Sequence, residues 1–286
     1  MQSACFICGG SDYRKVGIVD EFPLLECANC QLQFLSPPPS KAQLDAIYAN
    51  YYEAWGIHEE AGADMVTEMK TATFNGYLDL VTRHVKSGNF LDVGCATGEM
   101  LAAAAKLGFE PYGVEISPEG VATCQTKFGM DRIHGGYLQR EIFPSNFFAC
   151  IMMSDVIEHL PDPEAMKALL LDLLQPGGIL VISTPDTGTL SRRVMQRHWP
   201  QYKEEHLLYF NRENLSRWLS DSFNILTVDH ARKCLSLGYI GQILRREKKR
   251  PLLKWFGYII DKFPNIINKK LIRIHFGELL CIAKKI

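Results

Sequence analysis

Residues 91–98 read LDVGCATG, and this stretch decides the fold class. An apolar run ends there in small residues, and EMLAAAAK, which has helical spacing, follows at once. The order predicts a strand, a tight turn and a helix. Small residues in such a turn let the backbone approach a nucleotide-like ligand at the carboxyl end of a sheet, so we expect a ligand site at this turn.

The segments that follow alternate in the same way. The strand-like runs NFLDVG, EPYGVE, FFACIMMS and GGILVIST are separated by segments with helical spacing, such as SPEGVATCQTKF and PEAMKALLLDLL. Two further strands are predicted at residues 223–231 and 277–286. Alternation of this kind is typical of an α/β fold in which helices cover both faces of a doubly wound parallel sheet.

Glu115 indicates the class of ligand. It ends the second predicted strand, where a carboxylate can accept hydrogen bonds from both hydroxyls of a ribose. A nicotinamide dinucleotide site would read G-x-G-x-x-G, but the positions from Gly94 onward end in Glu99, which would repel a pyrophosphate. Glu99 and Asp92 instead suit a cofactor that carries positive charge, such as S-adenosylmethionine.

Four motifs, LDVGCATGEML, GVEIS, MMSDVIEHLPDP and LLQPGGILVISTP, resemble in sequence and order those of class I S-adenosylmethionine-dependent methyltransferases. The resemblance covers residues 75–231 and implies a Rossmann-like sheet of seven strands, the last one antiparallel. It implies these cofactor-binding residues: Asp92, Gly94, Cys95 and Gly98 for the amino-acid and sugar portions, Glu115 for the ribose, Asp155 and Val156 beside the methionine, and the backbone near Gly136 and Tyr137 for the adenine.

Two pairs of cysteines, Cys5-x-x-Cys8 and Cys27-x-x-Cys30, are separated by eighteen residues. Each pair can place two thiolates on one tight turn, so that four sulfurs meet at a tetrahedral metal ion. The spacing predicts a zinc ribbon. Because four protein ligands leave no open position, we expect the zinc ion to be structural.

The leader from CFICGG to YYEAW also resembles that of a bacterial methyltransferase subgroup linked to sugar and surface-polysaccharide modification, including sugar C-methyltransferases. The resemblance implies a small-molecule or lipid-linked sugar as the methyl acceptor in surface glycan biosynthesis, and it leaves the acceptor atom open. Two alternatives remain. One is an RNA methyltransferase that holds phosphates with the ribbon and a basic tail, although the ribbon has only Arg14 and Lys15 as basic residues. The other is a catalytically silent binding module.

Methyl transfer to a hydroxyl or a carbon needs a base near the acceptor. His206 follows the fifth predicted strand and is the first candidate, with Glu204 or Glu205 placed to orient its imidazole. The sugar C-methyltransferases carry a similar Glu-His pair with a nearby tyrosine, which Tyr202 matches. The pair Glu158-His159, after the fourth strand, is the alternative, and a structural role for either histidine stays open.

The carboxyl-terminal part of the chain is basic. Residues 232–286 hold fourteen Lys or Arg and three acidic residues, so they carry +11, and the remainder carries −12 because the whole chain carries −1. LLKWFGYIIDKF predicts an amphipathic helix that ends before Pro264. We expect a basic helical insertion at residues 232–275 that meets an anionic membrane or the diphosphate of a glycan carrier. A lid, a subunit contact and a solvated face are the alternatives.

Composition bounds the location and the domain plan. With 47% hydrophobic and 22% charged residues the chain is that of a globular protein, without a membrane-spanning run or a signal-peptide pattern. Nine cysteines, four of them in metal-type pairs, fit a reducing compartment, so we expect a cytoplasmic protein that is at most peripheral to a membrane. The predicted domains are a zinc ribbon (1–38), a helical lead-in (39–88), a cofactor-binding core (89–231), the insertion (232–275) and the final strand (276–286).

Overall fold

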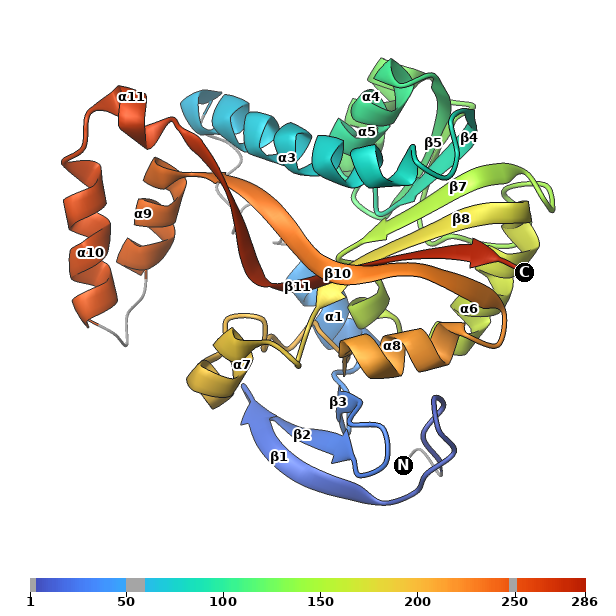
Figure 1. Ribbon diagram of the computed structural model, residues 1–286, viewed down its shortest axis with the longest axis horizontal. Helices are drawn as coiled ribbons and strands as arrows, with labels where there is room; N and C mark the ends of the chain where they lie inside the picture. The colour runs from blue at the N-terminus through green and yellow to red at the C-terminus, as the bar shows by residue number, and fades with distance from the viewer. Residues whose placement is uncertain (1–3, 50–59, 247–250) are drawn as a thin grey trace.

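The computed structural model describes residues 4–49, 60–246 and 251–286, and its centre is a seven-stranded sheet (Figure 1). The strands are, in sheet order, β10 (Phe223–Ser236), β11 (Leu271–Lys285), β8 (Leu174–Pro185), β7 (Phe148–Ser154), β4 (Gly88–Val93), β5 (Phe109–Glu115) and β6 (Ile133–Gly135). β11 is antiparallel to both of its neighbours, and all other pairs are parallel. The expected Rossmann-like sheet with an antiparallel last strand is confirmed.

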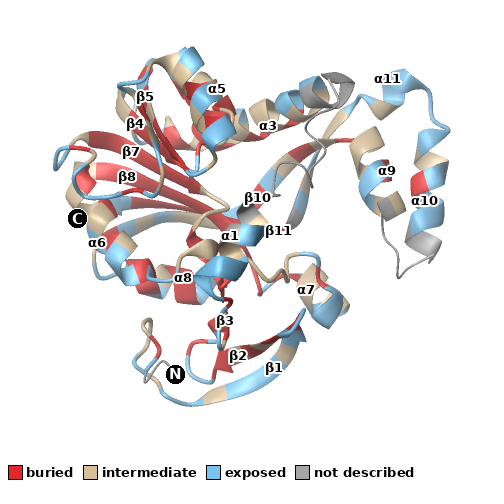
Figure 2. Ribbon diagram, turned by 180° about the vertical axis from the view of Figure 1, so that it is seen from behind, coloured by how far each residue is buried: buried red, intermediate tan, exposed pale blue. Residues whose placement is uncertain are grey.

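Helices cover both faces of this sheet (Figure 1). On one face lie α3 (Glu60–Val81), α4 (Glu99–Lys106) and α5 (Pro118–Phe128), and on the other lie α6 (Pro163–Leu173) and α8 (Arg212–Leu219). Successive strand residues serve opposite faces: Phe90 packs in a cluster with Leu78 of α3, whereas Leu91 packs in one with Leu170 of α6. Both faces of β4, β7 and β8 are therefore buried (Figure 2).

The amino-terminal module is a small sheet that continues into the core. Its strands are β1 (Tyr13–Val19), β2 (Phe22–Cys27) and β3 (Gln33–Leu35), followed by α1 (Lys41–Ala49). β3 also pairs with β9 (Leu208–Tyr209), a strand that no pattern in the sequence predicts. A two-residue strand forms there because β3 supplies its hydrogen-bonding partner. The module thus packs directly on the segment that precedes α8.

The insertion differs from the expected helical segment of residues 232–275. β10 and β11 stay paired as far as Ser236 and Leu271, beyond Glu278, which pairs with the last residue of β8. Only the tip of this extension is helical, with α9 (Leu237–Arg246), α10 (Pro251–Asp261) and α11 (Asn265–Asn268). We call these three helices the arm; they project beyond the carboxyl edge of the parallel strands (Figure 1).

The final strand therefore begins at Leu271, not at residue 276 as expected, because backbone pairing between β10 and β11 continues outside the main sheet. The predicted amphipathic helix is present as α10. No helix in the described part of the chain is long and apolar enough to cross a membrane.

Candidate active site

The turn after β4 has the backbone geometry that its small residues predict. Gly94, Ala96 and Gly98 all have positive φ, at 79°, 47° and 86°. A Cβ atom on Gly94 would lie 2.9 Å from a Cγ of Val156, so only glycine fits there. Val156, which follows β7, thus lies against this turn.

Glu115 ties the turn to the end of β5. Its carboxylate accepts hydrogen bonds from the backbone N–H groups of Ala96 and Ser117, both at 2.8 Å. The side chain is 6% exposed, at the edge where the carboxyl ends of the parallel strands meet. Each of its oxygens keeps a lone pair for a further donor such as a ribose hydroxyl.

Asp92 lies in β4 and is buried, at 4% exposure. Burial raises the pKa of Asp92 well above its usual value, and the nearby Glu115 and Glu99 raise it further. The Lys70 Nζ lies 3.8 Å from a carboxylate oxygen of Glu99. Three carboxylates around one turn favour a ligand with positive charge.

The remaining residues expected to bind the cofactor are Cys95, Gly136 and Tyr137. The Cys95 sulfur lies 3.9 Å from that of Cys124 in the core, so only the backbone of Cys95 faces the turn. Gly136 donates its N–H to the carbonyl of Glu115 at 2.8 Å, and Tyr137 is 58% exposed beside it. These two residues follow the short strand β6 at the same edge of the sheet.

Asp155 is engaged by a lysine from the basic tail. The Lys233 Nζ lies 3.1 Å from a carboxylate oxygen of Asp155 and 2.6 Å from one of Glu278. Gln201 donates to the same Glu278 oxygen at 2.9 Å. Sequence reasoning missed this network, because no local pattern distinguishes Lys233 from its solvated neighbours.

His206 lies in the segment between η2 (Gln196–His198) and β9 and is 4% exposed. Burial lowers its pKa well below the usual value, and the adjacent His159 lowers it further, although a hydrogen bond to the backbone of Gln201 opposes both effects. The two imidazole rings meet edge to face with centroids 4.7 Å apart. Burial likewise lowers the pKa of His159 to about 4.

Glu205 and Tyr202 bond residues other than His206, contrary to the expectation from the sequence. The carboxylate of Glu205 lies 3.8 Å from the Lys203 Nζ, and its carbonyl binds His159 at 2.9 Å. The Tyr202 hydroxyl donates to Gln33 of β3 at 2.7 Å and accepts from Arg192. His206 Nδ1 has no hydrogen-bond partner within the residues that the structure describes, so neither neighbouring carboxylate orients it.

Glu158 is the acidic residue that lies with both histidines, since one side-chain N or O atom of each of the three residues lies within 4.8 Å of the others. It belongs to η1 (Ile157–His159) and is fully buried, with one carboxylate oxygen accepting from Thr184 at 3.0 Å. Its other oxygen has no hydrogen-bond partner in the described part of the molecule. The Glu-His pair after the fourth predicted strand could have indicated it, but only the fold brings the pair to His206.

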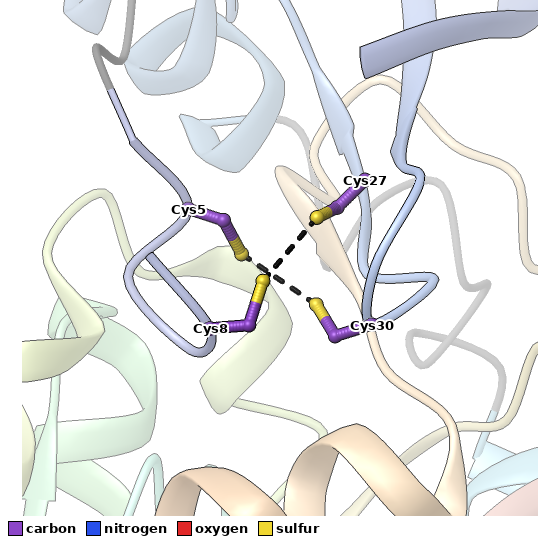
Figure 3. A group of neighbouring side chains, drawn as sticks. All are labelled: Cys5, Cys8, Cys27 and Cys30. Carbon is purple, nitrogen blue, oxygen red and sulfur yellow. Dashed lines mark hydrogen bonds between the residues drawn. The ribbon is translucent and has the colours of Figure 1, made fainter. Parts of the chain in front are cut away.

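The four cysteines of the amino-terminal module converge (Figure 3). The sulfur of Cys5 lies 3.6 Å from that of Cys30, and the sulfur of Cys8 lies 3.5 Å from that of Cys27. All four sulfurs lie within 4.8 Å of one another. Four thiolates around a tetrahedral zinc ion are about 3.8 Å apart, so this arrangement fits that metal.

The cofactor turn and the strand order agree with the comparisons to known proteins. A family model described as a methyltransferase domain matches residues 65–225. The ubiquinone biosynthesis O-methyltransferase of Methylococcus capsulatus is 24% identical over 194 residues, which span 62% of this chain and 81% of that protein. That of Xanthomonas campestris pv. campestris is 31% identical over 115 residues, which span 37% of this chain and 48% of that protein.

Solved structures agree on the fold. A methyltransferase from Bacillus halodurans superposes with a TM-score of 0.52 at 13% identity, covering 74% of this chain and 98% of that one. An S-adenosylmethionine-dependent methyltransferase from Archaeoglobus fulgidus gives 0.50 at 20% identity, with 75% and 94% covered. Because the family model spans more than half of the chain, the chain belongs to the methyltransferase-domain family and is an S-adenosylmethionine-dependent methyltransferase.

Proposed function

We propose that the enzyme methylates a hydroxyl of a sugar or of a sugar-containing intermediate of surface glycan biosynthesis. The leader sequence supports the sugar, because it resembles that of the polysaccharide-modifying subgroup. Oxygen as the acceptor atom draws support from relatives named as O-methyltransferases. The observation that carries the proposal is the buried polar cluster of Glu158, His159 and His206 next to the residues that follow β7, where an acceptor hydroxyl would need a group to remove its proton.

The residues around the turn after β4 suit S-adenosylmethionine. Glu115 would hold the ribose hydroxyls, and the buried Asp92 would face the positively charged portion. Gly94 leaves room for Val156 against the turn, and Val156 would border the cofactor. Bound there, the cofactor supplies a methyl group on a sulfonium, whose departure as a neutral thioether needs no acid from the protein. His206 would act on the acceptor side as a base or an orienting group.

A pocket of about 390 Å³ beside Tyr202 supports a phosphorylated form of the sugar. Arg192, Arg193 and Arg197 line it from α7 (Leu190–Met195) and the segment that follows, and β1 closes the opposite wall. Arginine binds phosphate oxygens through two parallel hydrogen bonds. A nucleotide-linked or lipid-linked sugar carries a diphosphate that such a pocket would hold.

We infer that the cysteine cluster binds one structural zinc ion. Its role would be to hold the acceptor segment, since β3 pairs with β9 directly after His206, and Asn214 of α8 donates to the Cys30 carbonyl at 3.2 Å. A module this small has too little core to fold without the metal.

The arm is the candidate membrane contact. Its exposed apolar side chains include Trp255, Phe256, Tyr258 and Ile266, of which Ile266 is 83% exposed. Ile260 instead packs on α9, where a Cβ on Gly241 would lie 3.0 Å from it, so only part of the apolar side of the predicted amphipathic helix faces outward. We propose that this surface docks on an anionic membrane, which would place the cofactor edge near a lipid-linked acceptor.

Two experiments test these proposals. Purified protein with radiolabelled S-adenosylmethionine should methylate nucleotide-linked or lipid-linked sugars and not RNA, and Arg193→Gln should raise KM for them more than it changes kcat. Labelling of RNA alone would overturn the sugar proposal.

Sedimentation with anionic and neutral vesicles tests the arm. The double variant Trp255→Ser with Phe256→Ser should abolish salt-sensitive binding to anionic vesicles. If the protein binds neither kind of vesicle, the membrane proposal is wrong.

A further inference from the structure

The pocket beside Tyr202 has walls that come from segments far apart in the sequence. β1 of the amino-terminal module forms one wall, and α7 with η2 forms the other; β1 and α7 lie side by side in both views of the molecule (Figure 1, Figure 2). A small core joins the two walls, because Leu24 of β2 packs in one cluster with Trp199 and Tyr209, and Tyr202 packs against that cluster. The fold therefore holds this pocket of about 390 Å³ in place.

The wall formed by α7 and η2 is basic. Arg192, Arg193 and Arg197 line it, and no carboxylate lines the pocket among the residues that the structure describes. Arg192 is held in place, since its Nε donates to the Tyr202 hydroxyl at 3.0 Å and that hydroxyl donates to Gln33 at 2.7 Å. The terminal nitrogens of Arg192 point to the role that guanidinium groups have in binding phosphate oxygens through paired hydrogen bonds. Three arginines on one wall suit a diphosphate, which carries several negative charges.

The opposite wall and the neighbouring surface of α7 are apolar and exposed. Val16 and Ile18 of β1 line the pocket and are 37% and 54% exposed, and Leu190 and Val194 of α7 are 74% and 73% exposed. Leu190 and Val194 are four residues apart, so they share one face of the helix, and Arg193 borders that face. Contact with hydrocarbon would remove these side chains from water. The surface thus favours a ligand that joins an anionic group to an apolar chain.

The same lining offers little to a nucleotide. Recognition of a ribose uses an acceptor such as a carboxylate, and none lines this pocket in the described part of the chain. The ring of Tyr202 already packs edge to face against Trp199 and Tyr209, with ring centroids 5.1 Å apart in both pairs. Apart from the arginines, Gln196 and Tyr202 supply the polar side chains of the lining. A base would therefore find few specific hydrogen bonds, whereas a hydrocarbon chain needs none.

We propose that this pocket binds the diphosphate of a long-chain alcohol, with the diphosphate on the arginines and the first part of the chain on the apolar side chains of β1 and α7. The inference rests on the proposed function and narrows it, because it selects a lipid-linked sugar over a nucleotide-linked sugar as the acceptor. Tyr202 connects the pocket to His206, since its ring packs on Tyr209, whose ring centroid lies 5.9 Å from that of His206. The amino-terminal module then supplies one wall of the acceptor's binding site.

Calorimetric titration of the full-length protein tests the proposal, with farnesyl diphosphate as the probe. Inorganic diphosphate and uridine diphosphate are the comparison ligands, because they carry the same anionic group without an apolar chain. We expect farnesyl diphosphate to bind at least about tenfold more tightly than either, since burial of a few CH₂ groups supplies that difference. Arg193→Gln should weaken the binding of farnesyl diphosphate by about fivefold or more. Arg83→Gln, at an exposed arginine after α3, is the matched control and should bind as wild type does.

A second variant separates the apolar surface from the charge. Ile18→Ser combined with Val194→Ser should weaken the binding of farnesyl diphosphate by about tenfold and leave that of uridine diphosphate unchanged. Met130→Ser, at an apolar residue that is 77% exposed elsewhere on the molecule, is the control. The arm variant Trp255→Ser with Phe256→Ser should also bind as wild type does, because the probe is expected in the pocket and not on the arm. An unchanged Tm shows that each variant keeps its fold.

Three results overturn the proposal: no binding of farnesyl diphosphate, equal or tighter binding of uridine diphosphate, and equal binding of farnesyl diphosphate by wild type and both pocket variants. Loss of binding in the arm variant alone would also overturn it, since the probe would then lie on the arm. The titrations contain no S-adenosylmethionine, so they are independent of the methylation assay. Methylation of a sugar without binding of farnesyl diphosphate would leave the proposed function standing and this inference wrong. Labelling of RNA alone by a protein that binds farnesyl diphosphate as expected would do the reverse.

Discussion

The cofactor half of the site, which is the turn after β4 with Glu115, and the acceptor half that we propose around His206 are built in different ways. The cofactor half comes from the ends of neighbouring strands, and its contacts join residues of successive segments, such as Ala96 with Glu115. The acceptor half joins η1, the segment before β9, the ribbon and the paired strands β10 and β11. A local segment forms its geometry from its own sequence, whereas an assembled site depends on every element that packs around it. The two halves should therefore respond differently to substitution.

The largest effect is expected from Cys27→Ser, which removes one of the four sulfurs that we propose bind zinc. The ribbon should lose its metal and unfold, because metal binding is the main source of its folding free energy. Methyl transfer should fall by about a hundredfold or more as the acceptor segment loses its β3 partner, while the affinity for S-adenosylmethionine changes by less than about threefold. Metal analysis, activity and calorimetry measure the three quantities.

A matched control is Cys281→Ala, which removes a buried thiol of the core and should leave the zinc content at one equivalent. A Cys27→Ser protein with full zinc content and activity would contradict the prediction. A parallel loss of cofactor affinity would show that the two halves are not independent.

Glu115→Ala tests the cofactor half, where the expected loss is in the affinity for the cofactor. Loss of a buried carboxylate that binds two hydroxyls should weaken S-adenosylmethionine binding by well over tenfold, which corresponds to a few kcal/mol. The exposed Glu119, four residues along the chain in α5, provides the control Glu119→Ala. Calorimetry with both variants decides, and an unchanged affinity for Glu115→Ala would mean that the ribose binds elsewhere.

Lys233→Met removes the charge that joins the two halves. Asp155 and Glu278 would then face each other without a counter-ion. We expect the free energy of unfolding to fall by about 2 kcal/mol, which is less than for a fully buried pair because this network is only partly buried. Lys254→Met, on the exposed side of α10, is the control and should have little effect. Urea unfolding followed by fluorescence measures both. Equal stability of the two variants would show that Lys233 is simply solvated.

The smallest effect concerns Asp92 and pH. Because burial raises the pKa of Asp92 in the folded protein, the folded state holds this proton more tightly than the unfolded chain does. The associated stability is complete below the unfolded pKa of about 4 and is lost as pH rises through the higher folded pKa. Asp92→Asn does not titrate, so without cofactor it should gain about 1 kcal/mol over wild type between acidic and neutral pH.

Urea unfolding of Asp92→Asn and wild-type protein at several pH values gives that difference. The same variant should bind S-adenosylmethionine more weakly at neutral pH, because it lacks the negative charge for the cofactor. A stability difference that does not change with pH would contradict the assignment of a raised pKa to Asp92.

Sequence alone predicted the parts that depend on neighbouring residues. The turn at 91–98 follows from small residues between a strand and a helix, and Gly94 and Gly98 adopt the positive φ that only such residues allow readily. The cysteine spacing likewise predicted four converging sulfurs, since each C-x-x-C pair forms its own tight turn. The alternation of strands and helices predicted the sheet, because each element buries its own apolar face.

Tertiary structure decided the rest. Which residues face His206 depends on the packing of η1 against the segment before β9, and no spacing in the chain encodes that contact. Lys233 counted with the basic tail by sequence, yet the pairing of β10 with β11 brings it to Asp155 and Glu278. The cysteine spacing predicted the ribbon as a module, but no sequence pattern predicted its pairing with β9. Contacts between distant segments are selected by the shape and unsatisfied polar groups of the whole fold, which a local pattern does not contain.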